Sequence, residues 1–317
     1  MKMLALKNAC NSSRDFGDVI KTKHCKGDKN MFNKTYKLLN GVEIPLLGLG
    51  TWLLEDAQAA QAVRDAVSIG YRHIDTAQAY MNEAGIGEGI RSCGVAREEL
   101  FITTKVAAEA KTYEEVTKSI DESLTKMGVD YIDLLIIHSP QPWTEFREEK
   151  RYFEENKEAW KAMEDAYKEG KVKAIGFSNF LQDDIENILS SCEIKPMVNQ
   201  ILAHVSNTPL ELIEFSQKNG ILVEAYSPIA HGAVLDNEEV KVIADKYGVS
   251  VAQLCLRYDI QLGLAVIPKT AKPNHMKNNA ELDFVISDAD MEILKNVEPI
   301  QDYGEHSYFP VFGGKLK

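Results

Sequence analysis

Short apolar segments alternate with longer amphipathic segments along most of this chain. Seven apolar runs of strand length each end at a polar residue and precede a segment with helical spacing: 71–74, 100–104, 131–137, 173–177, 197–198, 221–225 and 264–268. An eighth run, residues 46–51, comes before them. Strands that alternate with helices form a parallel sheet, and eight such repeats close a barrel. The pattern therefore predicts an α/β fold, a (β/α)8 TIM barrel.

Helical periodicity gives bounds for seven connecting segments: 56–67, 112–127, 156–168, 181–190, 209–218, 238–246 and 251–258. Before the first barrel strand, residues 36–45 alternate around Asn40-Gly41, which is a strong β-hairpin signal. We expect this N-terminal β-hairpin to cap the bottom of the barrel. A Rossmann fold is disfavoured, because no G-x-G-x-x-G follows a strand and residues 48–50 lack the third glycine.

The composition fits one decorated barrel of 317 residues, of which 44% are hydrophobic. Residues 1–32 are rich in lysine and small polar residues without periodicity. We expect them to be a disordered extension, or to precede a true start at Met31, and we assign residues 33–317 to the barrel. The net charge of −12 argues against a nucleic-acid partner. No run approaches the ~18 apolar residues of a membrane span.

The cysteines and histidines indicate neither disulfides nor a metal site. Five cysteines occur, an odd number, and none forms a C-x-x-C pair. We expect free thiols in a reducing compartment, which favours the cytoplasm. No spacing of histidine, cysteine and carboxylate residues resembles a zinc site, so no metal is expected.

Polar residues at three neighbouring strand ends form the sharpest candidate site. Asp75, Lys105 and His138 end three of the runs, and Tyr80 follows Asp75 by five positions. Strand ends of a barrel converge on one mouth, where the chemistry of this fold takes place. A phenol has an ordinary pKa of about 10, which a nearby ammonium lowers. We expect Lys105, held by Asp75, to make Tyr80 a general acid toward an alkoxide, while His138 orients the substrate oxygen.

Three segments resemble the signatures of the aldo-keto reductase family, in the family's order: residues 70–77 with Tyr80, residues 133–138 and residues 267–270. The resemblance runs from about residue 34 to about residue 300. It implies that Asp75, Tyr80, Lys105 and His138 are the catalytic tetrad, and that Tyr80 protonates a carbonyl that receives hydride from NADPH, NAD being possible. Within the family, the chain most resembles the microbial subgroup that includes diketogluconate and methylglyoxal reductases.

The resemblance also implies a set of cofactor contacts. Amides suit the nicotinamide carboxamide, because they both donate and accept hydrogen bonds. The family places Ser178, Asn179 and Gln200 at that carboxamide, Tyr226 against the nicotinamide ring and Ser227 at the pyrophosphate. The other expected contacts are Gly50, Thr51, Asp75, Lys269, Thr270, His275 and Asn279.

One expected cofactor contact departs from the family pattern. Lys269 and Thr270 fit the family's clamp on the 2′-phosphate of NADPH, but His275 stands where the family has arginine. Histidine is mostly neutral at pH 7 and cannot make a two-pronged contact with phosphate. The preference for NADPH over NADH is therefore expected to be weaker than in members that carry the arginine.

The substrate pocket is expected at Trp52, Tyr80, His138 and Ser139. Many members have tryptophan directly after the catalytic histidine, so Ser139 would make this wall smaller and more polar unless Trp143 replaces it. Residues 141–156 are expected to form a solvated loop over the mouth. Residues 303–312 either fold over the pocket, as the resemblance implies, or dock on the outer helices.

Two other functions remain as alternatives. The first is a cofactor-binding regulatory subunit with little turnover, like the potassium-channel β-subunits that share this fold. The second is a barrel hydrolase, which needs a carboxylate partner for Asp75, and no other strand end named above carries one. We favour an enzyme that acts on a small carbonyl compound, as a monomer and without nucleic-acid or membrane partners.

Overall fold

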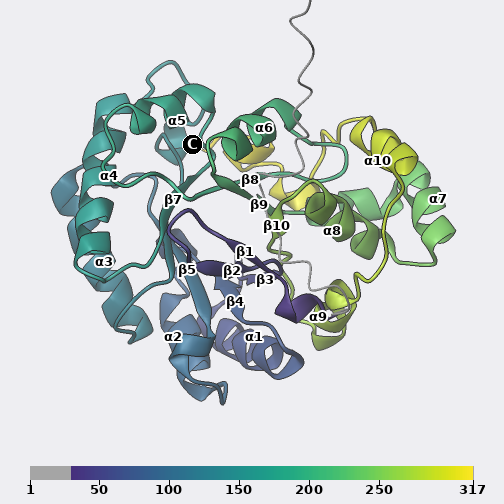
Figure 1. Cartoon of the computed structure of the whole chain (residues 1–317), viewed down its shortest axis with the longest axis horizontal. Coiled ribbons are helices and arrows are strands. Elements are labelled where there is room, and N and C mark those ends of the chain that lie inside the picture. Colours follow the sequence, from purple (N-terminus) through teal and green to yellow (C-terminus); the bar gives the residue numbers. More distant parts are fainter. Residues whose placement is uncertain (1–29, 317) are drawn as a thin grey trace, which may run out of the picture.

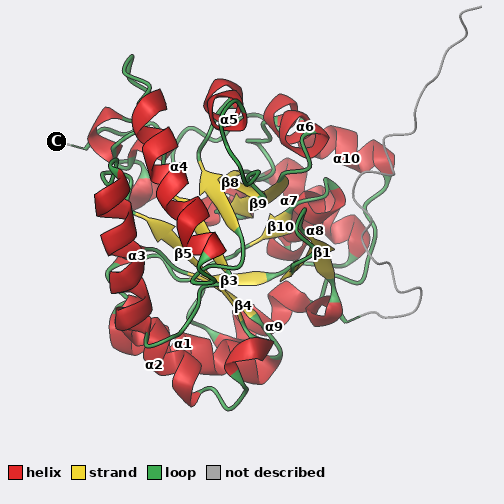
Figure 2. Ribbon diagram, turned by 60° about the vertical axis from the view of Figure 1, so that its left-hand side comes forward, coloured by secondary structure: helices red, strands yellow, loops and turns green. Residues whose placement is uncertain are grey.

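The computed structural model describes residues 30–316 and shows a barrel of parallel strands inside a ring of helices (Figures 1 and 2). The eight strands of the sheet follow one another in chain order. They are β3 (Gly48–Gly50), β4 (His73–Asp75), β5 (Phe101–Val106), β6 (Leu134–Ile137), β7 (Ile175–Ser178), β8 (Val198–Leu202), β9 (Leu222–Tyr226) and β10 (Ala265–Val266). The predicted (β/α)8 barrel is confirmed.

Two isolated bridges close the barrel along the seam between β3 and β10. Leu47 pairs with Val266, and Gly50 pairs with Lys269. The amide of Gly50 donates a hydrogen bond to the carbonyl of Pro268 at 3.2 Å. A Cβ atom at Gly50 would lie 2.8 Å from a neighbouring carbonyl oxygen, so the close approach of the two backbones requires glycine here.

Ten α-helices lie within residues 30–316. They are α1 (Asp56–Ile69), α2 (Glu83–Ser92), α3 (Tyr113–Met127), α4 (Phe153–Lys168), α5 (Gln182–Leu189), α6 (Leu210–Lys218), α7 (Glu238–Tyr247), α8 (Val251–Gln261), α9 (Pro273–Ala280) and α10 (Asp288–Lys295). The seven segments with predicted bounds are all helical, and α4 begins three residues before its predicted start. In α2, Gly85 and Gly87 lower helix propensity but allow tight packing, because Cβ atoms there would overlap the backbone of Asp56 and Met127.

The predicted hairpin covers the N-terminal end of the barrel. Strands β1 (Thr35–Lys37) and β2 (Glu43–Pro45) pair antiparallel. The hydroxyl of Tyr36 donates to the carbonyl of Leu264, just before β10, at 3.1 Å. Residues 1–29 of the predicted extension lie outside the described residues. Met31, which fell within that extension, is buried in the core, so the packed chain begins before residue 33.

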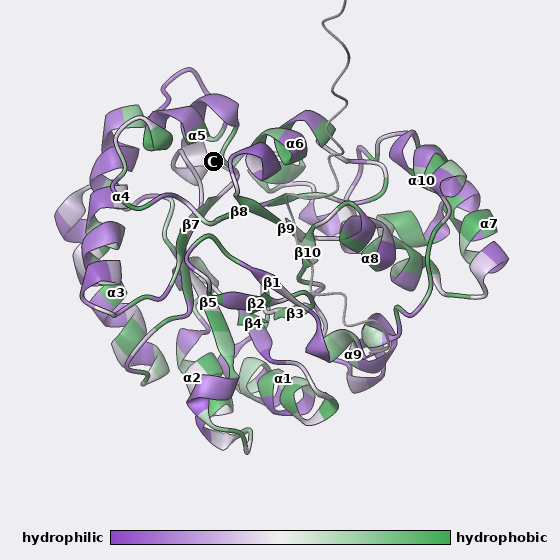
Figure 3. Cartoon of the chain, in the orientation of Figure 1, coloured by the Kyte–Doolittle hydropathy of each residue, from purple (hydrophilic) through white to green (hydrophobic). Residues whose placement is uncertain are grey.

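Figure 3 shows mainly hydrophobic strands inside helices whose colours alternate between hydrophilic and hydrophobic. Lys105 in β5 and Glu224 in β9 are exceptions, since both are ionisable residues with no exposed surface. Burial of a charge is unfavourable unless it is paired or neutralised, so these two side chains need polar partners inside the barrel. Among the described residues, no helix combines the length and apolar character that crossing a membrane requires. Cys93, Cys192 and Cys255 are free thiols.

Candidate active site

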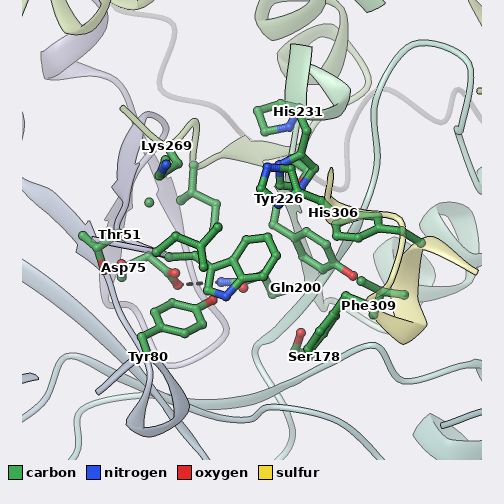
Figure 4. Close-up of a pocket in the computed structure, with 18 of the residues that line it drawn as sticks. Thr51, Asp75, Tyr80, Ser178, Gln200, Tyr226, His231, Lys269, His306 and Phe309 are labelled. Carbon is green, nitrogen blue, oxygen red and sulfur yellow. Dashed lines mark hydrogen bonds between the residues drawn. The ribbon is translucent and has the colours of Figure 1, made fainter. Parts of the chain in front are cut away.

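A cavity of about 490 Å³ opens at the C-terminal ends of the barrel strands (Figure 4). Its volume lies within the range that small-molecule sites occupy. The predicted site residues that line it are Gly50, Thr51, Trp52, Asp75, Tyr80, His138, Ser178, Asn179, Gln200, Tyr226, Ser227 and Lys269. Residues from all parts of the barrel therefore meet at one cavity, as the strand-end pattern predicted.

Of the four predicted catalytic residues, Asp75, Tyr80 and His138 line this cavity, and Lys105 is buried in contact with Asp75 and Tyr80. Asp75 ends β4, Lys105 lies in β5, His138 follows β6, and Tyr80 lies in the short 3-10 helix after β4. The ammonium Nζ of Lys105 donates to Asp75 Oδ1 at 2.5 Å and to the hydroxyl oxygen of Tyr80 at 3.3 Å. A third bond runs from Nζ to the carbonyl of Thr76 at 2.9 Å. All three donors of the ammonium are thus used, which fixes its position below the phenol.

The charge states of this group follow from burial and from the ion pair. Burial lowers the pKa of Lys105, but the charges and hydrogen bonds of Asp75 and Tyr80 outweigh burial and raise it, so the ammonium form persists. Burial raises the pKa of Tyr80, while the charge of Lys105 opposes that rise. The expectation that the pKa of Tyr80 lies below its ordinary value is wrong, because burial dominates. Tyr80 is therefore a protonated phenol at neutral pH.

His138 lies beside Tyr80 as a neutral imidazole. The two rings meet edge to face, with centroids 5.6 Å apart. Burial lowers the pKa of His138 well below its ordinary value, and the charge of Lys105 lowers it further. A neutral imidazole can donate or accept one hydrogen bond on each ring nitrogen, depending on its tautomer. It can therefore orient an oxygen that lies next to the phenol without competing with it as an acid.

The predicted nicotinamide contacts form one hydrogen-bonded wall. The hydroxyl of Tyr226 donates to Asn179 Oδ1 at 2.7 Å. The amide nitrogen of Asn179 donates to the carbonyl of His138 at 3.1 Å and to Ser178 Oγ at 3.0 Å. Asn179 therefore links β7, β9 and the end of β6. Gln200 also lines the cavity, and its amide nitrogen donates to Asp75 Oδ2 at 2.7 Å.

The outer end of the cavity carries the predicted phosphate contacts only in part. Ser227 and Lys269 line the cavity, and Ser227 Oγ lies 3.0 Å from Nε2 of His231. The remaining three predicted contacts, Thr270, His275 and Asn279, do not line it. They lie on α9 or in the turn that leads to it. Only a ligand that extends from the cavity toward α9 could reach them.

Ser139 does not form the expected wall of the substrate pocket. It is completely buried, and its hydroxyl and carbonyl accept hydrogen bonds from the amide of Gln141 and the ammonium of Lys111. Trp143 lines the cavity in its place, with its ring 5.1 Å from that of His138. The loop after β6 returns toward the barrel mouth, so an aromatic residue four positions later fills this side. The wall is therefore large and apolar rather than small and polar.

The C-terminal segment folds over the cavity. His306, Phe309 and Phe312 line it, and in Figure 4 His306 and Phe309 lie across the cavity from Tyr80 and Asp75. This arrangement agrees with the position implied by the family resemblance rather than with docking on the outer helices. His231 and His306 stack with ring centroids 4.2 Å apart, which joins the loop after β9 to this segment. His306 lies in the segment that the family resemblance places over the pocket, but neither histidine was predicted as a site residue, because their contact depends on how the chain end packs.

A second carboxyl group lies close to Asp75. Glu224 Oε2 accepts a hydrogen bond from the amide nitrogen of Gln200 at 2.6 Å, and the same nitrogen binds Asp75. This carboxyl group comes from the interior of β9, not from a strand end, so the search of strand ends for a partner of Asp75 did not include it. A hydrolase remains disfavoured, because Glu224 is fully buried and does not line the cavity. A charged residue inside an apolar strand was the available signal for this group.

Comparison with known proteins gives one consistent result. The sequence matches the model of the Aldo/keto reductase family over residues 46–299. Glyoxal reductase of Bacillus subtilis (strain 168) is 44% identical over 260 residues, which cover 81% of this chain and 90% of that protein. The crystal structure of an aldo/keto reductase from Brucella melitensis is 39% identical, with a TM-score of 0.77 and coverage of 83% of this chain and 99% of that one.

A second solved structure, a Bombyx mori aldo-keto reductase in complex with NADP, is 33% identical to this chain. Its TM-score is 0.78, and the match covers 86% of this chain and 95% of that chain. The predicted family, fold and class of activity are confirmed. This chain belongs to the aldo/keto reductase family, whose reaction is the NAD(P)H-dependent reduction of a carbonyl group.

Proposed function

We propose that this protein reduces small aldehydes and α-dicarbonyl compounds with NADPH, and that Tyr80 protonates the substrate oxygen. The observation that carries the proposal is the buried ammonium of Lys105, which contacts both Asp75 and the hydroxyl of Tyr80 beneath the cavity. This arrangement stabilises a phenolate as it forms. The name of the Bacillus subtilis relative, a glyoxal reductase, supports the α-dicarbonyl class.

The proton path follows from the hydrogen bonds of the phenol. Lys105 donates to the hydroxyl oxygen of Tyr80, so the phenolic hydrogen is free to point into the cavity. A substrate oxygen that accepts this hydrogen also comes within reach of the imidazole of His138. As the oxygen gains negative charge, Tyr80 transfers its proton, and the adjacent ammonium stabilises the resulting phenolate. Asp75 keeps that ammonium in place.

The residues present fit a nicotinamide dinucleotide. The amide oxygen of Gln200 and the hydroxyl of Ser178 suit a carboxamide, and the ring of Tyr226 offers an apolar face. At the outer end, the side chain of Lys269 lines the cavity and is exposed, which suits a phosphate group. When bound, the cofactor supplies the hydride. The protein's part is to hold its nicotinamide beside Tyr80 and His138.

A substrate panel tests the proposed function. Purified protein is assayed with simple aldehydes, α-dicarbonyls and keto-sugars, with NADPH and with NADH. We expect turnover of α-dicarbonyls with NADPH. Cofactor binding with no turnover across the panel would favour the regulatory alternative, and keto-sugars as the best substrates would favour the diketogluconate reductases of the predicted subgroup. We also propose that the enzyme is a monomer and that it works in the cytoplasm. Its free thiols support the second of these proposals, because the cytoplasm is a reducing compartment.

Trp143→Ala should shift substrate preference toward larger carbonyl compounds. The indole packs against His138 and Phe309, so its loss opens the side of the pocket where substrate is expected. We expect the ratio of kcat/KM for a bulky aromatic aldehyde to that for a small dicarbonyl to rise about tenfold, within the range of pocket-shape effects. The control is Trp160→Phe, a change outside the cavity. Equal changes for both substrates would show that Trp143 sets stability rather than selectivity.

His275→Arg should strengthen the binding of NADPH. His275 is exposed in the first turn of α9, close in sequence to Lys269 and Thr270. An arginine there can bind the 2′-phosphate in a bidentate way, for a gain of about 1–3 kcal/mol, and NADH lacks that phosphate. Dissociation constants for both cofactors measure the effect. Lys277→Gln is the control, since residue 277 lies about 200° around the same helix. Equal tightening of NADH would place residue 275 away from the 2′-phosphate.

A further inference from the structure

The carboxyl group of Glu224 lies just beneath the cavity floor and has no catalytic part in the reaction described above. Its Oε2 accepts a hydrogen bond from Gln200 Nε2 at 2.6 Å. Its Oε1 has no hydrogen-bond partner among the described residues, and Nδ1 of His73, a neutral imidazole because burial lowers its pKa to about 3, lies 3.7 Å away. Burial of a carboxyl group is unfavourable, so its presence in an apolar strand calls for a compensating role.

Glu224 and Asp75 together occupy the amide nitrogen of Gln200. A primary amide nitrogen carries two hydrogens, and here both are donated to carboxyl oxygens, at 2.6 and 2.7 Å. Reversal of the amide would place its acceptor oxygen against the negative carboxylate of Asp75 and would remove the donor that Glu224 Oε2 now accepts, which is unfavourable. The amide oxygen of Gln200 is therefore the group left for a ligand, and Gln200 lines the cavity.

Charge balance supports this arrangement. Burial, together with the negative charge of Asp75, raises the pKa of Glu224 to about 8, although the hydrogen bond from Gln200 and the charge of Lys105 oppose this rise. At neutral pH Glu224 is therefore mainly a neutral acid, which accepts the hydrogen bond through one oxygen. Because Lys105 is already neutralised by Asp75, a second full negative charge here would disturb the ion pair and make Tyr80 a weaker acid.

We propose that Glu224 is a positioning residue that fixes the amide of Gln200 with its oxygen toward the cavity, so that the site selects a ligand with a carboxamide N–H donor. This inference rests on the proposed function, because the carboxamide in question is that of the nicotinamide. Asp75 alone holds one edge of the Gln200 amide. Glu224 supplies the second contact, which stops the amide from rotating about the first.

Binding of two cofactors tests the proposal without reference to turnover. Reduced NADP and its reduced 3-acetylpyridine analogue differ in the group that faces Gln200, since the analogue has a methyl ketone and no N–H donor. We expect the wild type to bind NADPH more tightly than the analogue. Glu224→Ala should reduce this preference by about 2–10-fold, the effect of one hydrogen bond, chiefly through weaker NADPH binding. Dissociation constants from tryptophan fluorescence measure it.

Two further variants separate orientation from stability. Glu224→Gln keeps an acceptor oxygen for Gln200, so it should retain most of the preference for NADPH. Glu164→Ala is the matched control, because Glu164 is also buried and accepts two backbone hydrogen bonds, but in α4, outside the barrel. It should lower the melting temperature and leave the preference unchanged.

The outcomes distinguish the positioning role from its alternatives. An unchanged preference in Glu224→Ala, or equal loss in Glu224→Ala and Glu224→Gln, would overturn the positioning role. A wild type that binds both cofactors equally would overturn it too, even with turnover intact. Failure of the wild type to bind NADPH at all would instead refute the proposed function.

Discussion

Tyr80→Phe is expected to lower kcat for carbonyl reduction by about 10²–10⁴-fold, the usual contribution of a general acid. The change removes only the hydroxyl that Lys105 contacts, and the ring can still pack edge to face against His138. Affinity for NADPH should change little, since the hydroxyl is assigned to the substrate. Steady-state kinetics and cofactor titration together give the result.

A second tyrosine provides the control for this variant. The hydroxyl of Tyr131 is buried and has no hydrogen-bond partner among the described residues, and it lies outside the cavity. Tyr131→Phe should leave kcat unchanged. If Tyr80→Phe kept more than about a tenth of the wild-type kcat, another group would have to be the proton donor.

Lys105→Met is expected to lower kcat by about 10²–10³-fold, the size seen when one group that stabilises developing charge is removed. Burial already raises the pKa of Tyr80, and Lys105 is the group that opposes this rise. Without the ammonium, the pKa of Tyr80 rises further, so the phenol is a weaker acid and its phenolate is harder to form. The rate of alcohol oxidation, which needs the phenolate as base, should therefore reach its maximum at a higher pH.

The same change leaves Asp75 as an unpaired buried carboxylate. Loss of one partner of a buried pair typically costs about 3–5 kcal/mol, so the single variant should also unfold more easily. The double variant Asp75→Asn/Lys105→Met removes the uncompensated charge and should regain stability without regaining kcat. A pH–rate profile identical to that of the wild type in Lys105→Met would show that Lys105 does not act on Tyr80.

The sequence was sufficient for features that depend on backbone topology. Asp75, His138 and Lys269 each follow an apolar run. The parallel strands of a barrel bring such positions to the same end of the barrel, regardless of how the side chains there pack. The same reasoning located Tyr226 and Gln200. These predictions required only the order of the elements and the ends of the strands.

Features that depend on side-chain packing could not be predicted. Ser139 follows His138 directly, yet it turns inward while Trp143 fills the pocket wall, because the path of a long loop decides which residue faces the cavity. The direction of the pKa shift of Tyr80 could be predicted only from how deeply the phenol is buried, because the effect of burial exceeds that of the Lys105 charge. Likewise, α2 was not among the predicted helices, because its glycines lower helix propensity. It forms because these glycines allow tight packing against neighbouring segments.

Because of the seam between β3 and β10, the stability of the folded barrel is expected to depend on the concentration of the cofactor. Gly50 and Lys269 come from distant parts of the chain, meet at this seam, and both line the cavity. Contacts between such distant segments are slow to form, because a long loop must close before they can. A dinucleotide that touches both sides binds only the closed barrel, and therefore stabilises it in proportion to the logarithm of its concentration. Where the cofactor is scarce, the seam loses this stabilisation.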